Sequence, residues 1–334
     1  MFRKRFVLPA GLLTGLAFSG SAALAAPVPT INVGSNPNAI VISSAQGQAY
    51  VANDGSVSVV DLTTHMQTAE VSTTVNHGQT AIGLFRNGAK VYVGDFALST
   101  MVSFNPRTRA VKPGIRVGRG VTDMADAGNR FAYISELGQE GAVGRVKIVN
   151  TTTDAVAKTI ILKAGAGTLT TRPNNRTVWV GSAVSGRIWV VNTQSNTITR
   201  RLLASKSGPV QGIAFAPNGT QVWVSGLGGV SVVDRSTGKL IHFIPTNSVF
   251  PANPPFTPGP ILMNSTGTEA LVLNTAVQTG GPGSVASINT TTFTRTQSIL
   301  LGNEPTSFAI DPTTNLVLAT NFLDDTLSYF TAPS

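Results

Sequence analysis

The 334-residue chain contains no cysteine. It therefore forms no disulfide, and it offers no thiolate nucleophile, no zinc–thiolate cluster and no cysteine for a lipid anchor. Charged residues make up only 12% of the chain and aromatic residues 7%, whereas 42% of the residues are apolar. A chain with so few charges and so many apolar residues can fill a sizeable core, which excludes a solvated, disordered polypeptide.

Sequence patterns of long helices are also missing. The chain has 34 glycines and 19 prolines, and Val, Ile, Thr and Ser alternate through most of its length. Glycine and proline interrupt helices, whereas this alternation is typical of strands that bury one face. The composition predicts an all-β, turn-rich fold.

The amino terminus has the layout of a secretory signal peptide. Arg3, Lys4 and Arg5 precede an apolar stretch over residues 6–18 and a run of small residues over 19–26. We expect residues 1–25 to be removed, leaving residues 26–334 as one exported domain in a periplasm or outside the cell, without a membrane anchor. Removal would take away three of the 24 basic residues and none of the 15 acidic ones, so a net charge of +6 would remain.

No catalytic motif is present. The sequence lacks the G-x-S-x-G elbow, the G-x-x-x-x-G-K phosphate loop and the H-E-x-x-H metal motif. Its three histidines, His65, His77 and His242, are far apart and fit neither a metal site nor a catalytic triad. The sequence therefore predicts no catalytic residue, no metal and no cofactor.

An internal repeat is the strongest feature of the sequence. A short apolar strand recurs seven times, at intervals of 41 to 49 residues, near the period of four-stranded propeller blades. Its copies are centred on Tyr50, Tyr92, Tyr133, Trp179, Trp223, Val272 and Val317.

Each copy is flanked by further strands. One apolar segment precedes it, and another follows it after a polar loop. In six repeats the following segment ends in an Asp or Asn, a residue type that caps tight turns through its side chain. These residues are Asp61, Asn105, Asn150, Asn192, Asp234 and Asn289. With a polar outer strand, each repeat makes a blade of four antiparallel strands.

The two ends of the chain predict how the ring closes. After the seventh repeat's third strand only residues 331–334 remain, too few for a fourth strand. Residues 28–33, ahead of the first repeat, resemble the segments that end other repeats. Pairing them into the last blade would close a seven-bladed β-propeller and remove an unpaired sheet edge.

The repeats resemble those of the YVTN-type β-propeller family. The closest matches are Val33-Gly34 with Tyr50-Val51-Ala52-Asn53, and the sequence Val230-Ser231-Val232-Val233-Asp234. The last two copies lack the Tyr, and Phe330 stands where the final Asx residue is expected. The resemblance implies an exported, YncE-like propeller. It also implies three functions: single-stranded DNA binding, lactone hydrolysis, or a non-catalytic role in a periplasmic redox complex.

Aromatic residues supply candidate ligand contacts at the channel mouth. Phe96 and Phe322 lie in similar loops and are expected on one face of the ring, where they can stack a base or a sugar. Phe256 lies in residues 245–260, a connection with six prolines that is long enough to act as a lid or to contact a protein partner. Packing of each Phe on its own blade, and a tolerated loop insertion, are the alternative interpretations.

A run of cations supplies a candidate polyanion site. It contains no acidic residue and comprises Arg107, Arg109, Lys112, Arg116 and Arg119. Five cations on one strand and its loops can bind phosphates, although outer propeller strands also carry charge simply to discourage edge pairing.

Two carboxylates are candidates inside the channel. Asp123 and Asp126 occupy an inner strand at positions where another repeat has Ile213 and Ala216. One of them is expected to face the channel and orient a ligand or cation, unless water and backbone amides satisfy it. The sequence favours a non-enzymatic binding or scaffold propeller, with a polyanion or single-stranded nucleic acid as a candidate ligand. The alternatives are a lactonase-type enzyme using channel carboxylates and a redox-complex subunit.

Overall fold

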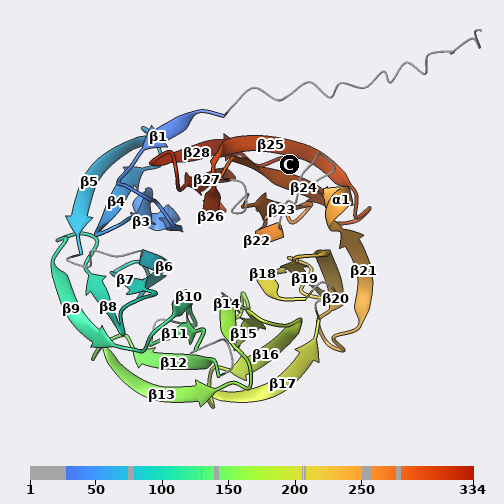
Figure 1. The fold of residues 1–334 in the computed structure, drawn as a ribbon, viewed down its shortest axis with the longest axis horizontal. Helices are drawn as coiled ribbons and strands as arrows, with labels where there is room; N and C mark the ends of the chain where they lie inside the picture. Colours follow the sequence, from blue (N-terminus) through green and yellow to red (C-terminus); the bar gives the residue numbers. More distant parts are fainter. Residues whose placement is uncertain are drawn as a thin grey trace, which may run out of the picture.

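The strands of the chain carry the alternating burial that a sheet with one buried face requires. The computed structural model places them in seven separate sheets of four antiparallel strands. Figure 1 shows these sheets as blades arranged radially around a central axis. The fold is a seven-bladed β-propeller, as the repeats predicted. The structure describes residues 28–73, 79–128, 130–138, 143–204, 206, 208–249, 258–275 and 280–334.

The first four blades each take four consecutive strands, numbered from the centre of the ring outward (Figure 1). Blade 1 comprises β2 (Ala39–Ser43), β3 (Gln48–Ala52), β4 (Ser56–Asp61) and β5 (Met66–Ser72). Blade 2 comprises β6 (Gln79–Phe85), β7 (Lys90–Asp95), β8 (Thr100–Phe104) and β9 (Val111–Arg116). Blade 3 comprises β10 (Val121–Asp126), β11 (Phe131–Glu136), β12 (Arg145–Asn150) and β13 (Ala155–Ile161). Blade 4 comprises β14 (Ala166–Thr171), β15 (Thr177–Ser182), β16 (Arg187–Asn192) and β17 (Thr197–Leu203).

The remaining blades follow the same plan until the last. Blade 5 comprises β18 (Val210–Phe215), β19 (Gln221–Gly226), β20 (Gly229–Asp234) and β21 (Leu240–Pro245). Blade 6 comprises β22 (Pro258–Met263), β23 (Glu269–Asn274), β24 (Pro282–Asn289) and β25 (Arg295–Asn303). Blade 7 comprises β26 (Pro305–Ile310), β27 (Leu316–Asn321), β28 (Thr326–Thr331) and β1 (Thr30–Asn32). The described helices are one 3₁₀ turn, η1 (Ser44–Gln46), and one short helix, α1 (Thr246–Val249), and neither is long enough to cross a membrane.

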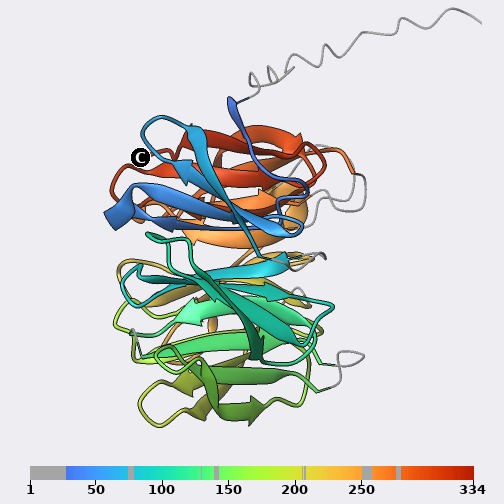
Figure 2. The same ribbon diagram turned by 90° about the vertical axis from the view of Figure 1, so that its left-hand side faces the viewer.

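The ring is closed by the first strand of the chain. Figure 2 shows β1 beside the strands that end the sequence, and β1 pairs antiparallel with β28, with Ile31 opposite Leu327. Two backbone hydrogen bonds extend this pairing: the N–H of Tyr329 donates to Pro29 at 3.0 Å and that of Val33 to Asp325 at 3.0 Å. Because β1 comes from the opposite end of the chain, it supplies the fourth strand that blade 7 lacks. The predicted closure is confirmed.

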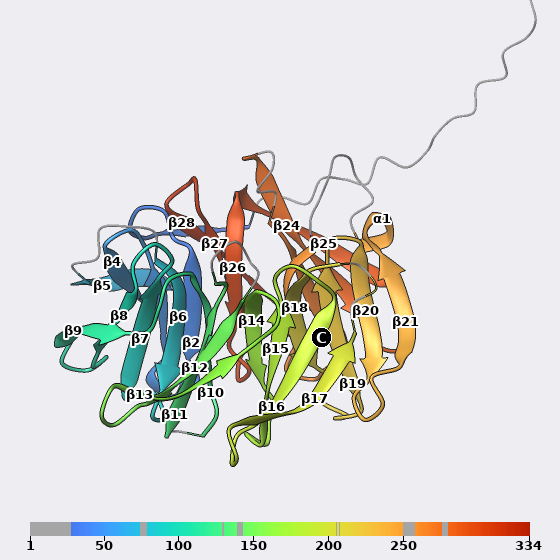
Figure 3. The ribbon, with the colours of Figure 1, turned by 60° about the horizontal axis from the view of Figure 1, so that its bottom comes forward.

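The core lies between neighbouring blades. The inner strands of adjacent blades lie side by side around the central channel (Figure 3). Apolar residues from the facing sheets fill the space between them, as where Tyr50 and Val59 of blade 1 pack with Ile82 and Phe104 of blade 2. Each interface therefore holds two neighbouring blades together, and blade 7 has four strands like the other blades, with β1 at its outer edge.

The Asx residues that end six third strands accept backbone N–H groups from the turn that follows. The side chain of Asn105 accepts from Arg107 and Thr108, and the other five accept in the same way. The turn chemistry predicted for these residues is confirmed. The seventh repeat is corrected, because Thr331, not Phe330, pairs opposite Leu316 at the position that Asx residues occupy elsewhere.

The fifth residue of these turns has a left-handed backbone, with φ between 53° and 74°. In blades 3, 4 and 6 the side chain of this residue contacts the repeated aromatic residue of the preceding blade. Tyr133 donates its hydroxyl hydrogen bond to the Asn196 side chain of blade 4, and the Trp223 ring lies 5.8 Å from that of Phe293 in blade 6. The repeated aromatic residue therefore links blades as well as filling the core.

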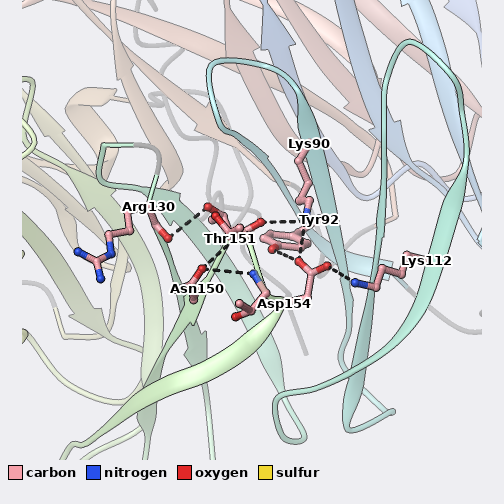
Figure 4. A network of polar contacts seen from close by, with 9 residues as sticks. Lys90, Tyr92, Lys112, Arg130, Asn150, Thr151 and Asp154 are labelled. Carbon is pink, nitrogen blue, oxygen red and sulfur yellow. Dashed lines mark hydrogen bonds and ion pairs between the residues drawn. The ribbon is translucent and has the colours of Figure 1, made fainter.

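The link between blades 2 and 3 includes two ion pairs (Figure 4). The carboxylate of Asp154 accepts from Lys90 at 2.7 Å, from the Tyr92 hydroxyl at 2.5 Å and from Lys112 at 2.9 Å. Lys90 also donates to the Thr151 carbonyl at 2.8 Å. Burial opposes ionisation of Asp154, but these three donors outweigh it and hold the pKa of the carboxyl below its ordinary value.

Candidate functional site

The ring has two faces that differ in the connections they carry. On the first, here called the loop face, outer strands connect to the next inner strand and second strands connect to third strands. On the second, the hairpin face, first strands connect to second strands and third strands to fourth strands. Binding residues in propellers are expected where loops converge at the channel, which is the loop face.

The central channel holds a cavity of about 560 Å³ lined by the inner strands of all seven blades. Both predicted carboxylates, Asp123 and Asp126, line it. Asp123 is held within the wall: its carboxylate accepts the N–H of Leu169 at 2.7 Å, that of Met124 at 2.7 Å and the Thr168 hydroxyl at 3.2 Å. Burial raises the pKa of Asp123 to about 6 even though these donors favour the charged form.

The contacts of Asp123 have a structural cause. A register shift in β14, between Ala166 and Leu169, interrupts its pairing with β15. The Leu169 N–H at this bulge bonds across to blade 3 and finds its acceptor in the Asp123 carboxylate. Asp123 therefore joins blades 3 and 4, and both of its oxygens already have donors.

The aromatic candidates lie in second-to-third strand loops on the loop face. Phe96 follows β7 and is 44% exposed, in a tight turn where the Asp95 carboxylate accepts the N–H groups of the two residues that follow Phe96. Phe322 follows β27 and is partly buried, and blade 1 stands between the two loops. Phe256 lies outside the residues that the structure describes.

The run of cations is divided between the two faces. Arg107 and Arg109 are exposed in the hairpin that joins β8 to β9, and Lys112 pairs with Asp154. Arg116 ends β9, and Arg119 lies in the connection to β10, on the loop face. The six residues of β9 separate these groups by about 17 Å, so the five cations do not form one patch.

Two of the predicted residues come together on the loop face. The connection that carries Arg119 is bonded to the loop of Phe96, because the Gly120 N–H donates to the Phe96 carbonyl at 2.8 Å. The Gly120 carbonyl accepts the N–H of Leu137 in blade 3 at 2.8 Å. Phe96 and Arg119 are therefore neighbours at the junction of blades 2 and 3.

A second cavity, of about 620 Å³, opens at this junction and was not predicted. Its lining includes Arg119, Glu136, Arg145 and Lys147. Glu136, the last residue of β11, is 2% exposed and its Oε1 has no hydrogen-bond partner. Burial raises the pKa of Glu136 to about 7, and the charges of Lys147 and Arg145 oppose that rise. We call this cavity, with these four residues in its lining, the blade-3 pocket.

The histidines have structural contacts where they are described. His65 stacks on Tyr329 with ring centres 4.2 Å apart, and His242 stacks on Phe293 at 4.7 Å. His77 lies outside the described residues. Within the part of the chain that the structure describes, no three His, Cys, Asp or Glu residues are grouped to hold a metal ion.

Comparison with known proteins supports the assignment of the fold but gives no information about the site. No family model matches the sequence, and no curated protein matches it. Among solved structures, the chain is similar to a chain of hydrazine synthase from Kuenenia stuttgartiensis, with a TM-score of 0.77 and 13% sequence identity. The match covers 93% of this chain and 98% of the other. At this identity the likeness shows the shared propeller fold alone.

Proposed function

We propose that this protein is an exported binding propeller that holds an anionic ligand on its loop face, at the junction of blades 2 and 3, without a chemical step. The observation that carries the proposal is the grouping of Arg116, Arg119 and the exposed ring of Phe96 at this junction. Among the described residues, the ion pairs both end on Asp154 at the hairpin face, so they leave these arginines available. Cations beside an exposed aromatic ring suit a single-stranded polyanion.

A salt titration tests this proposal. We expect a single-stranded oligonucleotide to bind, with log affinity falling linearly as log salt rises, because phosphate contacts release counterions. Replacing Arg116 with Ala should reduce the slope by about one. The control is Arg107→Ala on the hairpin face, which should leave both affinity and slope unchanged. No binding at low salt, or equal effects of the two variants, would reject a loop-face polyanion site.

A lactonase-type enzyme is the alternative that one observation favours, since Asp123 lines the channel with a pKa of about 6 and so could exchange protons near neutral pH. We expect the wild-type protein to open no lactone above background, because both oxygens of Asp123 are already occupied by donors. Lactone opening that Asp123→Ala abolishes and that Asp126→Ala retains would reject the binding proposal in favour of a lactonase.

A redox-complex subunit is the third possibility, and the likeness to a hydrazine synthase chain is compatible with it. Co-purification with a cofactor-bearing partner would support this function.

A further inference from the structure

The blade-3 pocket occupies a place that blades 1 and 7 close with neutral side chains. In blade 1, Asn53 directly follows the second strand, and its side chain donates to Ser56 at 3.3 Å and to Ser58 at 2.9 Å. The N–H of Gly34, from the incoming connection, donates to the same Ser58 hydroxyl at 2.9 Å. The Asn53 amide nitrogen and these hydroxyls therefore bond to one another, while the Asn53 Oδ1 has no partner.

Blade 7 repeats this arrangement. Asn321 donates to Thr326 at 2.9 Å and to Ser328 at 3.0 Å, and its carbonyl oxygen accepts the N–H of Gly302 at 3.1 Å. Blades 1 and 7, which meet at the ring closure, therefore both have one amide and two hydroxyl side chains at these three positions.

Blade 3 has three charged residues at the same positions. Glu136 replaces the Asn, and Arg145 and Lys147 replace the two hydroxyl residues of the third strand, as the strand pairing shows. The carboxylate is enclosed, because Gly118 lies against it so closely that a Cβ at this glycine would be 2.4 Å from Oε1. Gly118 also has a φ of +146°, so a side chain there would be strained as well as crowded.

Within the described residues, the carboxylate of the blade-3 pocket lacks a hydrogen-bond donor and its cations lack an ion-pair partner. The buried Oε1 of Glu136 needs a hydrogen-bond donor, since an unpaired buried acceptor is costly. The surrounding Arg119, Arg145 and Lys147 form no ion pair within the described residues, and these three positive charges outnumber the one carboxylate, so the pocket can hold an anion. One ligand group that meets both needs is an anion that carries its own acidic hydrogen.

We infer that the blade-3 pocket binds inorganic phosphate as HPO₄²⁻, with the three cations holding its anionic oxygens and Glu136 accepting its remaining hydrogen. Near pH 8 inorganic phosphate keeps this hydrogen, whereas a phosphate monoester, with a second pKa of about 6, has lost it. The pocket, at about 620 Å³, is large enough for the anion.

This chemistry makes a sharp discrimination possible. Sulfate has the shape of phosphate and, near pH 8, the same charge, but it has no hydrogen to donate. Near that pH Glu136, with a pKa of about 7, is mostly ionised and can only accept. Sulfate oxygens would therefore face the carboxylate without a hydrogen bond, and like charges would repel.

The inference rests on the proposed loop-face binding role, but the two can fail separately. Internal phosphodiesters of an oligonucleotide carry no P–OH, so they satisfy the arginines without satisfying Glu136. Titrating the oligonucleotide and inorganic phosphate separately therefore distinguishes binding of HPO₄²⁻ from general polyanion binding. No binding of the oligonucleotide, with inorganic phosphate still bound, would reject the polyanion role and retain the pocket.

The experiment is calorimetric titration of the full mature protein near pH 8, at constant ionic strength, with inorganic phosphate, glycerol 3-phosphate and sulfate. We expect inorganic phosphate to bind at least about tenfold more tightly than sulfate. Glycerol 3-phosphate, whose second pKa is about 6, carries no P–OH hydrogen near pH 8 and should bind no more tightly than sulfate.

Variants locate the site. Glu136→Gln should bind phosphate and sulfate within about threefold of each other, because its carboxamide can donate to either anion. Arg145→Ala should weaken phosphate binding about tenfold or more. The matched control is Arg187→Ala, at the same repeat position in blade 4, which should bind like wild type.

The comparison of phosphate with sulfate needs no variant, so it does not depend on the folding of any mutant. Equal binding of phosphate and sulfate by the wild-type protein would overturn the inference, and so would failure to bind inorganic phosphate. An equal effect of Arg145→Ala and Arg187→Ala would also overturn it, because binding would then reflect general surface charge.

Discussion

Ile31→Asp in β1 is expected to lower the free energy of unfolding by more than about 4 kcal/mol. Ile31 is 4% exposed and packs with Ile40 and Val51 of blade 1 and with Leu318 and Leu327 of blade 7. An aspartate there places an unpaired charge in the core that the first and last blades share, and it removes an apolar contact between β1 and β28. Denaturant unfolding followed by tryptophan fluorescence measures the loss.

The control lies in the same strand. Asn32→Asp introduces the same carboxylate one residue away, on the exposed side of β1, while keeping the backbone pairing with Thr326. It should change the free energy of unfolding by less than about 0.5 kcal/mol. Unfolding of the two variants at the same denaturant concentration would mean that β1 does not hold the ring together.

Asp154→Ala is expected to cost about 3 to 5 kcal/mol, because removing one partner of a buried ion pair leaves the other charge uncompensated. The side chain of Asp154 is 4% exposed, and that of Lys90, its nearest partner, is 18% exposed. Lys112→Ala is the control: its side chain is 65% exposed, so losing its ion pair should cost less than about 1 kcal/mol. Equal losses in the two variants would contradict the importance of the buried pair.

The same carboxyl predicts a dependence on pH. The pKa of Asp154 is lower in the folded protein than its ordinary value of 3.8. The folded state therefore binds this proton less readily than the unfolded state, so the stabilisation is fully present above the ordinary pKa and is lost as pH falls through the depressed one. Wild-type stability should fall below about pH 4 more steeply than that of Asp154→Ala. Parallel pH profiles would assign the loss to other carboxyls.

The sequence predicted the architecture because a propeller repeats its local signals. Turn-forming Asx residues and central aromatic residues recur at a fixed spacing, and both have roles within a blade or between adjacent blades. Ring closure was predictable for a related reason: the seventh repeat lacked a strand that residues 28–33 could supply.

The candidate site was predicted only in part, because it depends on distances across strands. Arg119 and Phe96 were identified, but their contact runs through backbone bonds of Gly120. The cations of the run are close in sequence and yet reach opposite faces, since an extended strand separates them. The partners of Asp123 depend on a bulge in β14 that no sequence pattern marked.

Glu136 was missed although a signal for it existed. The second strand of each repeat ends in a polar or small residue, as at Asn53 and Asn321, and Glu136 is the longest of them. Aligning the third strands as well would have placed Arg145 and Lys147 beside it. A repeat that departs from its neighbours at three positions in contact is a better indicator of a binding site than charge density along the chain.

A crystal structure of the protein with inorganic phosphate, near pH 8 and without sulfate, tests the central claim most directly. The account predicts a phosphate group in the blade-3 pocket, with Arg145 and Lys147 on its oxygens and one P–O oxygen within hydrogen-bond distance of Glu136. Phosphate bound instead in the central channel beside Asp123, or a blade-3 pocket left empty at a saturating concentration, would contradict it.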